Sequence, residues 1–567
     1  MLRTFGIEYV ALNPGASYRG LHDSLVNYGG NTKPEIILCT HEEIAVSIAH
    51  GYAKVTGQPM AAAVHDVVGL LHATMTIYYA QLDRAPVLVL GATGPVDRAR
   101  RRPYIDWIHT ALVNGNAVRD YTKWDDQPAT VADFPASFAR AYRIATTEPS
   151  GPVYVCYDAG LQESEIERPI EIADVAAGAR PSPVQADPAA IRSAAELLAG
   201  AERAVFVTEF TGRHPAAVGE LVGLAEETAA AVIDLNGRVN FPNRHEQNLT
   251  GGDALAEADL VVLFDVGDSS RALNELDRLT NEKRTRYRAG TPIVDIGLAE
   301  LRQSKWAEDL GQFQPVTLSI VADTQLAIPA LRAAVRQTAP RDRSARCAEL
   351  RRKHAEIKAR WEKEAHEDWD ASPLTAPRLA SEIWSVIKRE DWILTSNTLE
   401  DWALRLWEVD GPDRHPGRSF GTATQIGTSV GIGLAYRGTE RLVVDIQPDG
   451  DLLYDPGALW TAAHHRIPLL VVMYNNRAYY NDWEHQLRVA KHRGTPSENA
   501  RVGQELDDPA PDFAMLARSF GWHAEGPIAE PAKVRPALER ALEVVRHEKR
   551  PALVDTIVRH RQDKRFR

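Results

Sequence analysis

Carboxylate and amide side chains gather between residues 445 and 480, where they could bind a metal ion. Asp449 lies in an acidic, glycine-containing turn after one apolar run, and Asn475 and Asn476 follow the next apolar run. The two turns are about 30 residues apart, the length of a strand–helix–strand unit, which places both at the carboxyl edge of adjacent parallel strands. A carboxylate, an amide oxygen and a backbone carbonyl such as that of Ala478 suit Mg²⁺, whose octahedron water and substrate phosphates complete.

A second charged group opens a helical segment near the start of the chain. His41, Glu42 and Glu43 come directly before an apolar helical pattern that continues to Thr56. The helix dipole favours a glutamate in the first turn, so Glu42 taken alone predicts only a helix start. Glu43 is expected to lie on the surface.

The elements that position these groups are strands and helices in alternation. This pattern predicts an α/β fold of doubly wound parallel sheets that are covered by helices on both faces. The strand-like runs are Ile36–Cys39, Met60–Val64, Val87–Gly91, Val153–Tyr157, Ala204–Thr208, Leu260–Asp265, Ile293–Ile296, Ile393–Thr395, Leu442–Ile446 and Leu469–Tyr474.

Two segments divide the chain into three such domains. Residues 162–187 are rich in Glu, Pro and Ala and are expected to form a surface linker. Residues 341–371 are dense in Lys, Arg and Glu, which predicts a solvated helix that joins two domains. We therefore predict a first domain at residues 1–162, a middle domain at 186–338 and a third domain at 375–567.

Composition restricts the class of protein. A chain of 567 residues suggests about three domains, and its net charge of −12 argues against nucleic acid as a partner. The three cysteines are far apart, which excludes a disulfide framework and a cysteine zinc site. There is neither an apolar run of the roughly 18–20 residues that span a membrane nor a signal-peptide pattern. We therefore expect no membrane partner and a cytoplasmic location.

The metal-binding stretch resembles the thiamine diphosphate signature, in which Gly-Asp-Gly is followed by a helix and Asn-Asn. The segment from Thr40 to Gly57 is similar to the pattern His-Glu-x-x-Ala…Gly-Tyr-Ala-Arg-x-Thr-Gly of the same enzymes. From about residue 5 to 560 the chain resembles the acetolactate synthase/benzoylformate decarboxylase/2-hydroxyacyl-CoA lyase superfamily. The resemblance implies pyrimidine-binding, middle and diphosphate-binding domains, thiamine diphosphate and Mg²⁺ as cofactors, and a homodimer or homotetramer with the active site between chains.

Two residues depart from the signature. Pro448 stands where the family has its first glycine, and Asp451 stands where the usual serine follows the second. A proline is tolerated at a strand end, where no N–H group is needed. Asp451 adds a second carboxylate near the diphosphate, where it either reaches the metal or turns toward solvent.

The resemblance also implies roles for individual residues. Glu42 of one chain would hydrogen-bond to N1′ of the pyrimidine and so promote loss of the thiazolium C2 proton. Asp449, Asn476 and Ala478 of the other chain would hold the metal ion, and Ile426 would be the apolar wedge that bends the cofactor. The further expected cofactor contacts are Pro14, Gly15, Asn397, Gln425, Gly450, Asp451 and Tyr479.

Two other side chains bear on the reaction. His65 lies where acetolactate synthases have a different sequence and where benzoylformate decarboxylases have an active-site histidine, which predicts an acid/base role. Glu484 lies on the helix after Asn-Asn, which predicts a second pocket carboxylate that moves a proton. The alternatives are a hydrogen-bonded structural histidine and a surface glutamate.

The preferred hypothesis is a carbon–carbon lyase. It would cleave a short branched 2-hydroxyacyl-CoA, such as 2-hydroxyisobutyryl-CoA, to formyl-CoA and a ketone or aldehyde. The basic tail Arg559–Arg567 would close over the phosphates of coenzyme A, or is a solubilising tail. Asp234–Arg238, Asp265–Asp268 and Asp295 would form an ADP or CoA nucleotide site in the middle domain.

Two other hypotheses remain. One is a decarboxylase or carboligase that acts on a free 2-oxoacid, of the benzoylformate decarboxylase or acetolactate synthase type, which His65 favours. The other is a non-catalytic thiamine-binding homologue, which only Pro448 and Asp451 favour.

Overall fold

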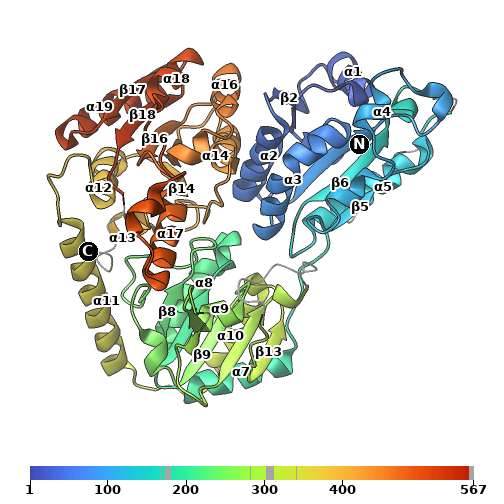
Figure 1. The fold of residues 1–567 in the computed structure, drawn as a ribbon. Coiled ribbons are helices and arrows are strands. Elements are labelled where there is room, and N and C mark those ends of the chain that lie inside the picture. Colours follow the sequence, from blue (N-terminus) through green and yellow to red (C-terminus); the bar gives the residue numbers. More distant parts are fainter. Residues whose placement is uncertain are drawn as a thin grey trace.

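Three parallel β-sheets flanked by helices make up the molecule, which is a computed structural model (Figure 1). It describes residues 1–166, 168–170, 172, 180–280, 282–301, 312–339 and 341–560. The predicted fold class is confirmed, because every pairing within the three sheets is parallel. None of the described helices combines the length and the apolar character that crossing a membrane requires.

The sheets follow one another along the chain. The first, in the order β2-β1-β3-β4-β6-β5, consists of β1 (Tyr9–Leu12), β2 (Glu35–Leu38), β3 (Met60–Ala63), β4 (Val87–Thr93), β5 (Trp124–Asp126) and β6 (Val153–Asp158). The second, in the order β13-β12-β9-β7-β8, consists of β7 (Ala204–Thr208), β8 (Ala231–Asp234), β9 (Leu260–Phe264), β12 (Ile293–Gly297) and β13 (Leu318–Val321). The third, in the order β14-β15-β16-β18-β17, consists of β14 (Trp392–Asn397), β15 (Leu442–Pro448), β16 (Leu470–Asn475), β17 (His523–Ile528) and β18 (Ala552–Ile557). Each sheet lies within one of the proposed domain ranges, and we call the three parts the first, middle and third domains.

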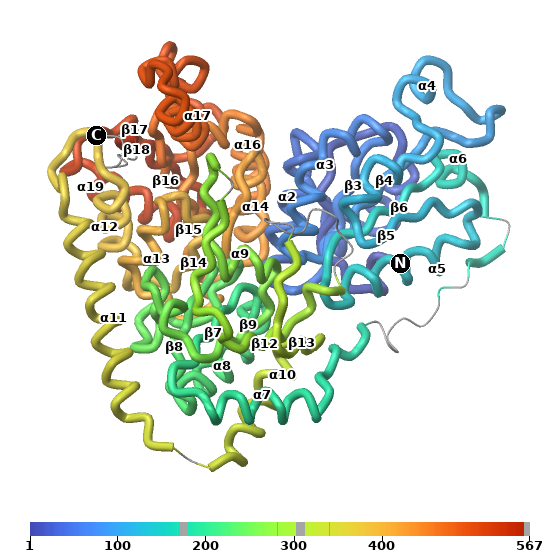
Figure 2. The backbone as a smooth tube through the Cα atoms, turned by 60° about the horizontal axis from the view of Figure 1, so that its bottom comes forward, coloured from blue at the N-terminus to red at the C-terminus, as the bar shows by residue number. Residues whose placement is uncertain are grey.

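The middle and third domains are joined by one long helix. It is α11 (Ser344–Ala365), which runs along the outside of the molecule (Figure 2). Most of its surface is exposed, but Leu350 and Ile357 are buried against the middle domain. The polar sequence therefore forms the predicted connecting helix, and a few apolar residues attach it.

The first and third domains meet through two helices whose backbones touch. They are α2 (Glu42–Thr56) and α14 (Thr424–Ala435), which lie side by side in Figure 1. A Cβ atom on Gly51 would lie 2.0 Å from the carbonyl oxygen of Thr428, and one on Gly431 would lie 2.1 Å from that of Ile48. Only glycine permits so close an approach at these two positions. One hydrophobic core therefore extends across both domains.

Buried ion pairs join the first and middle domains. Asp83 accepts hydrogen bonds from His50 and Arg238 and pairs with Lys54 at 2.8 Å. Arg84 pairs with Asp265 of the middle domain at 2.6 Å. Their charges are buried but paired, so loss of one partner would leave a buried charge uncompensated.

His465 makes the contact between the first and third domains sensitive to acid. Its Nε2 accepts a hydrogen bond of 2.8 Å from the backbone N–H of Leu38, which requires a neutral ring. Burial, with the nearby His464, lowers the pKa of His465 to about 4. Below pH 6.5 the unfolded chain takes up a proton that the folded chain does not, so stability falls until the pH reaches about 4.

We expect His465→Gln, which keeps an acceptor but does not titrate, to reduce the loss of stability between pH 7.5 and pH 5. The difference should be about 1 kcal/mol, after allowance for the partial exposure of the ring. Denaturant unfolding at the two pH values measures it. His492→Gln, at an exposed histidine of the same domain, is the control. Equal losses in wild type and His465→Gln would contradict the assignment.

Candidate active site

The predicted metal ligands come together at the carboxyl edge of the third sheet. Asp449 follows β15 and Asn476 follows β16, and these strands are hydrogen-bonded neighbours. The backbone N–H of Ala478 donates to Asp449 Oδ2 at 3.2 Å and to Asn476 Oδ1 at 3.0 Å. The strand spacing in the sequence therefore correctly predicted that the carboxylate and the amide oxygen are adjacent.

The electrostatics of this edge suit a cation. Asp449 is only 3 % exposed, and burial raises its pKa to about 6. Within the described part of the chain, neither a lysine nor an arginine pairs with Asp449 or Asp451. A buried carboxylate without a counter-ion is costly, and Mg²⁺ would remove that cost with the oxygen ligands that it prefers. Asp449 and Asn476 therefore fit the expected metal.

Asp451 does not turn toward solvent, one of the two positions that the sequence left open, and its contact with the metal stays a prediction. It is buried, and its carboxylate accepts hydrogen bonds from the backbone N–H of Ala423 at 2.8 Å and from Gln447 at 3.0 Å. Ala423 directly precedes α14, so Asp451 satisfies one of the free N–H groups at the start of that helix. The serine-to-aspartate departure therefore serves to hold α14 in place.

The start of α14 carries two of the predicted cofactor contacts. Gln425 is buried and donates to Asp445 at 3.1 Å and to the carbonyl of Ile446 at 2.8 Å. Ile426 has no exposed surface and lies in the core between α2 and α14. Their predicted cofactor contacts stay predictions, and the exposed side chain in the loop before α14 is Thr422.

Two other predicted contacts of the third domain also follow the carboxyl ends of its strands. Tyr479 packs against Gly450, where a Cβ atom would lie 2.5 Å from the ring. Asn397 ends β14 and donates to Asp401 at 3.4 Å, and its own Oδ1 is buried without a hydrogen-bond partner. Gly450 is therefore required for this packing, and Asn397 has an acceptor available for a ligand.

The first domain supplies a second group of site residues, again at a sheet edge. The loop with Pro14 and Gly15 follows β1, Glu42 follows β2, and His65 follows β3. The sheet order β2-β1-β3 makes these strands neighbours. The three predicted segments therefore converge at the carboxyl ends of adjacent strands, where α/β sheets bind ligands.

Glu42 is the first residue of α2 and is buried. Its Oε2 lies 3.0 Å from Nδ1 of His72, which is half exposed. A Cβ atom on Gly69 would lie 2.8 Å from Glu42 Oε1, so the glycine makes room for the carboxylate. The position and burial of Glu42 suit a carboxyl group that holds a proton at a fixed point. Glu42 is also the partner of His72.

His65 belongs to a polar cluster that sequence analysis did not foresee. Ser17 Oγ lies 2.8 Å from His65 Nδ1, and the rings of His65 and His109 are 5.1 Å apart. Burial, with the nearby His109, lowers the pKa of His65, so the ring is neutral at pH 7. A Cβ atom on Gly15 would lie 2.4 Å from His65 Cβ, so only glycine leaves room for the histidine side chain at this position. Neither Ser17 nor His109 lies in a motif, so only the fold brings them to His65.

Glu484 is not a surface residue. It is 4 % exposed on α17 (Tyr480–Arg493) and pairs with Arg488 at 2.8 Å. The ring of His560 stacks on Tyr480 at 4.8 Å, next to this helix. The rest of the basic tail, residues 561–567, lies outside the described residues.

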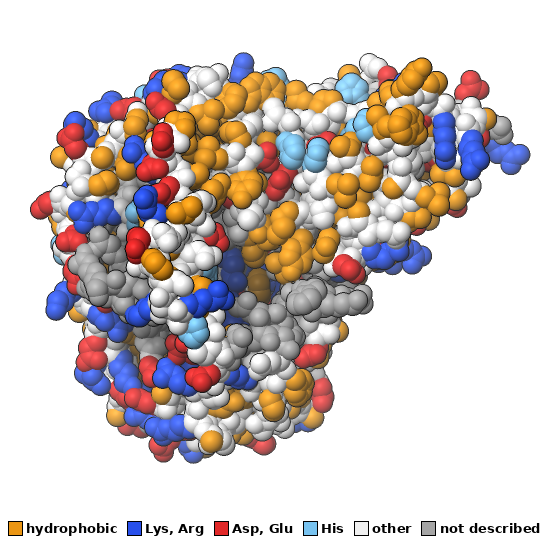
Figure 3. All heavy atoms as spheres, in the orientation of Figure 1, with side chains coloured by type: hydrophobic (Ala, Val, Ile, Leu, Met, Phe, Trp, Pro, Cys, Tyr) orange, Lys and Arg blue, Asp and Glu red, His pale blue; other side chains and the backbone are white. Residues whose placement is uncertain are grey.

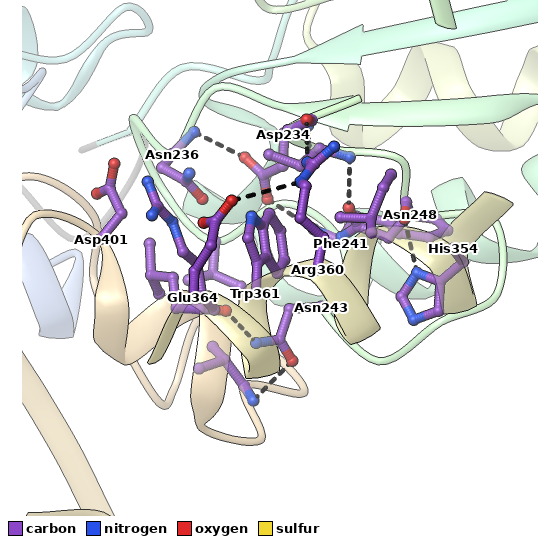
Figure 4. Close-up of a pocket in the computed structure, with 17 residues that line it drawn as sticks. Asp234, Asn236, Phe241, Asn243, Asn248, His354, Arg360, Trp361, Glu364 and Asp401 are labelled. Atoms are coloured by element: carbon purple, nitrogen blue, oxygen red, sulfur yellow. Dashed lines mark hydrogen bonds and ion pairs between the residues drawn. The ribbon is translucent and has the colours of Figure 1, made fainter. Parts of the chain in front are cut away.

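Most of the candidate nucleotide residues of the middle domain are engaged in structure. Asp265 pairs with Arg84 and Arg213, and Asp295 accepts a hydrogen bond from Ser269. Asp234 lines a cavity of about 370 Å³ between the middle domain, α11 and the third domain (Figure 4). Its carboxylate accepts hydrogen bonds from the backbone N–H groups of the loop that follows β8. None of the residues predicted to bind thiamine diphosphate or to act in catalysis lines this cavity.

The sheet edge with Glu42 and the sheet edge with Asp449 and Asn476 lie in two parts of the chain that match known protein families. The family described as "Thiamine pyrophosphate enzyme, N-terminal TPP binding domain" matches residues 1–114, and its C-terminal counterpart matches residues 398–556. The chain is thus a thiamine diphosphate-dependent enzyme of the acetolactate synthase/benzoylformate decarboxylase superfamily.

Individual relatives cover nearly the whole chain. The acetolactate synthase large subunit of Haemophilus influenzae is 22 % identical over 96 % of this chain and 91 % of its own length. The benzoylformate decarboxylase of Pseudomonas aeruginosa is 25 % identical over 98 % and 97 %. The crystal structure of benzoylformate decarboxylase from Polynucleobacter necessarius superposes with a TM-score of 0.78 at 18 % identity, over 98 % of this chain and 97 % of that chain. This likeness extends the shared fold through the middle domain.

Proposed function

We propose that the protein decarboxylates a 2-oxoacid to the corresponding aldehyde and CO₂. The observation that carries this proposal is the pair formed by Ser17 and His65 on the sheet edge that bears Glu42. Relatives of both the benzoylformate decarboxylase and the acetolactate synthase type support a free acid as substrate. Bound thiamine diphosphate supplies the electron sink for the carbon that loses CO₂.

The residues of this chain would provide the proton transfers. Glu42 would hold a proton at the buried edge of the first domain. His65 is neutral at pH 7, so it can take a proton from solvent and pass it to the carbon that has lost CO₂. Ser17 would orient the ring, and when His65 Nδ1–H donates to its oxygen, its O–H would donate a hydrogen bond to the substrate carboxylate. The balance is one proton consumed and one CO₂ released for each aldehyde.

His65→Ala should lower kcat for aldehyde formation from benzoylformate or pyruvate by about 10²–10³-fold, because the positioned proton donor is lost. Steady-state assays with Mg²⁺ and thiamine diphosphate measure the loss. His22→Ala, at an exposed histidine of the same domain, should leave the rate unchanged. Full activity of His65→Ala would refute the acid/base role.

The second candidate is the 2-hydroxyacyl-CoA lyase, which one specific observation favours. A groove of about 950 Å³ lies between α17 and the hairpin of β10 (Asn274–Leu276) and β11 (Lys283–Thr285). Basic side chains outnumber acidic ones along it, which suits the phosphates of coenzyme A. The basic residues are Arg278, Lys283, Arg284, Arg488 and Lys491, and the acidic ones are Glu275, Asp277 and Glu282.

Glu484→Gln separates the two reactions. Formation of formyl-CoA from 2-hydroxyisobutyryl-CoA should fall by about 10²-fold if Glu484 takes the hydroxyl proton of that substrate. Decarboxylation of a 2-oxoacid has no such proton, so its rate should change far less. Chromatography of formyl-CoA and of the aldehyde from parallel incubations measures both. Equal, small effects would leave Glu484 with only its structural contact to Arg488.

We also propose that the active enzyme is at least a dimer. Trp107 and Leu112 of the first domain are each 77 % exposed, and Tyr454 of the third domain is also exposed. Figure 3 shows hydrophobic side chains gathered on the upper part of one face, over the first and third domains. Apolar surface of this kind is typical of a protein interface.

The cytoplasmic location stays a prediction. The three unpaired cysteines are consistent with a reducing compartment.

A further inference from the structure

Three potential metal ligands meet where the first domain contacts the third. They are His41, which precedes α2, Glu43 in its first turn, and Asp455, between α15 (Asp449–Leu452) and α16 (Gly457–His464). One ligand atom from each lies within 4.8 Å of the other two. The two segments are tightly apposed, because a Cβ atom on Gly457 would lie 2.1 Å from Thr40 Oγ1.

The geometry of His41 and Asp455 calls for a third partner. His41 Nδ1 accepts a long hydrogen bond of 3.3 Å from the backbone N–H of Glu43, so this nitrogen carries a lone pair that could bind a metal ion in place of that N–H group. The same nitrogen faces Asp455 Oδ2 at 3.6 Å, too far for a hydrogen bond. Asp455 is only 8 % exposed, and this oxygen is buried without a hydrogen-bond partner. Something positive must therefore lie between these two atoms, either a proton, which Asp455 favours because it raises the pKa of His41, or a metal ion.

The surrounding charges reinforce this requirement. Glu43 is half-buried in the same cluster, and Asp455 is buried. Asp451 adds a further buried carboxylate nearby. Within the described residues, no lysine or arginine forms an ion pair with any of these three carboxylates. The cluster thus has an excess of buried negative charge, which a cation would compensate.

We propose that His41, Glu43 and Asp455 bind a divalent transition-metal ion of the zinc class, at a site separate from the magnesium site. One imidazole and two carboxylates are zinc ligands, whereas an imidazole does not suit Mg²⁺. Tetrahedral bonds of about 2.0–2.2 Å place two ligand atoms roughly 3.4 Å apart, close to the separation of His41 and Asp455. The ion would tie the start of α2, one residue from Glu42, to the third domain of the same chain.

Cobalt is the probe that tests this site. The holoenzyme, saturated with thiamine diphosphate and excess Mg²⁺, is titrated with Co²⁺ and followed by visible absorption and equilibrium dialysis. We expect about one bound Co²⁺ per chain with the intense absorption of four-coordinate cobalt. Asp455→Asn should abolish both signals. Asp413→Asn, at an exposed aspartate of the same domain, should retain them.

A second variant tests the site independently, in case Asp455→Asn does not fold. His41→Asn keeps a side chain that caps a helix but removes the nitrogen ligand, so it should also lose cobalt binding. Circular dichroism of each metal-free variant checks its fold. Two outcomes would overturn the proposal. One is a wild-type holoenzyme that binds no Co²⁺, in which case protons balance the cluster, and the other is equal binding by the wild type and both variants.

Discussion

Replacing Glu42 with glutamine should lower kcat by about 10²–10⁴-fold while the protein stays folded. The amide has nearly the same shape and keeps a contact with His72, but it cannot hold or release a proton at the buried edge of the first domain. Proton–deuterium exchange at C2 of bound thiamine diphosphate, measured by quenched NMR, reports the lost step directly. It should slow by a similar factor, whereas cofactor affinity should change little.

Glu35→Gln is the control for this experiment. Glu35 begins β2, at the opposite end of the strand from Glu42, and pairs with Arg437 on the surface between the domains. Its removal should leave C2 exchange at the wild-type rate. Rapid exchange in Glu42→Gln would show that another group performs the step, and His72 would then be examined first.

Asp449→Asn should have the other large effect, on binding of the cofactor. Loss of a charged ligand should weaken the complex with Mg²⁺ and thiamine diphosphate by about 100-fold or more. At a ligand concentration of about 100 Kd the wild type gains roughly 2.7 kcal/mol from binding, and the variant should lose most of that gain. Calorimetry and thermal unfolding with and without cofactor measure both quantities.

In the absence of cofactor, Asp449→Asn should not reduce the stability of the protein. In it Asp449 is a buried carboxylate without an ion pair among the described residues, so the neutral amide should leave stability unchanged or raise it slightly. A large loss of stability in the cofactor-free variant would show that Asp449 serves the fold rather than the metal. Asp413→Asn, at an exposed site, is the matched control.

Mixing the two inactive variants tests whether the site lies between chains. Random exchange of subunits makes half of the dimers mixed, and one site of each mixed dimer combines an intact Glu42 with an intact Asp449. About a quarter of wild-type activity should therefore return. A site within one chain would show no recovery.

Spacing and periodicity were sufficient to predict the sheet edges. Asp449 and Asn476 each follow an apolar run, and parallel topology leaves adjacent strands as their only arrangement at that spacing. What the sequence could not provide was the direction of side chains at element ends. Asp451 turns inward because the free N–H groups of α14 lie there, and no local pattern encodes that neighbour.

The same limit explains the residues that were missed or misplaced. Ser17 approaches His65 across 48 positions of sequence, and Glu43 was expected on the surface but faces Asp455 of another domain. Each of these depends on contacts between domains, which periodicity along one segment does not record.

The glycine contact between α2 and α14 limits how such enzymes can exchange parts. A relative with a larger residue at the position of Gly51 or Gly431 would bring a Cβ atom to 2.0 or 2.1 Å from a main-chain oxygen of this chain. A chimaera that takes α2 or α14 from such a relative, and the other helix from this chain, should therefore fail to assemble. This holds whichever substrate either parent prefers. Recombination should be tolerated instead when the two helices are inherited together and the middle domain keeps Arg238 and Asp265, the partners of Asp83 and Arg84.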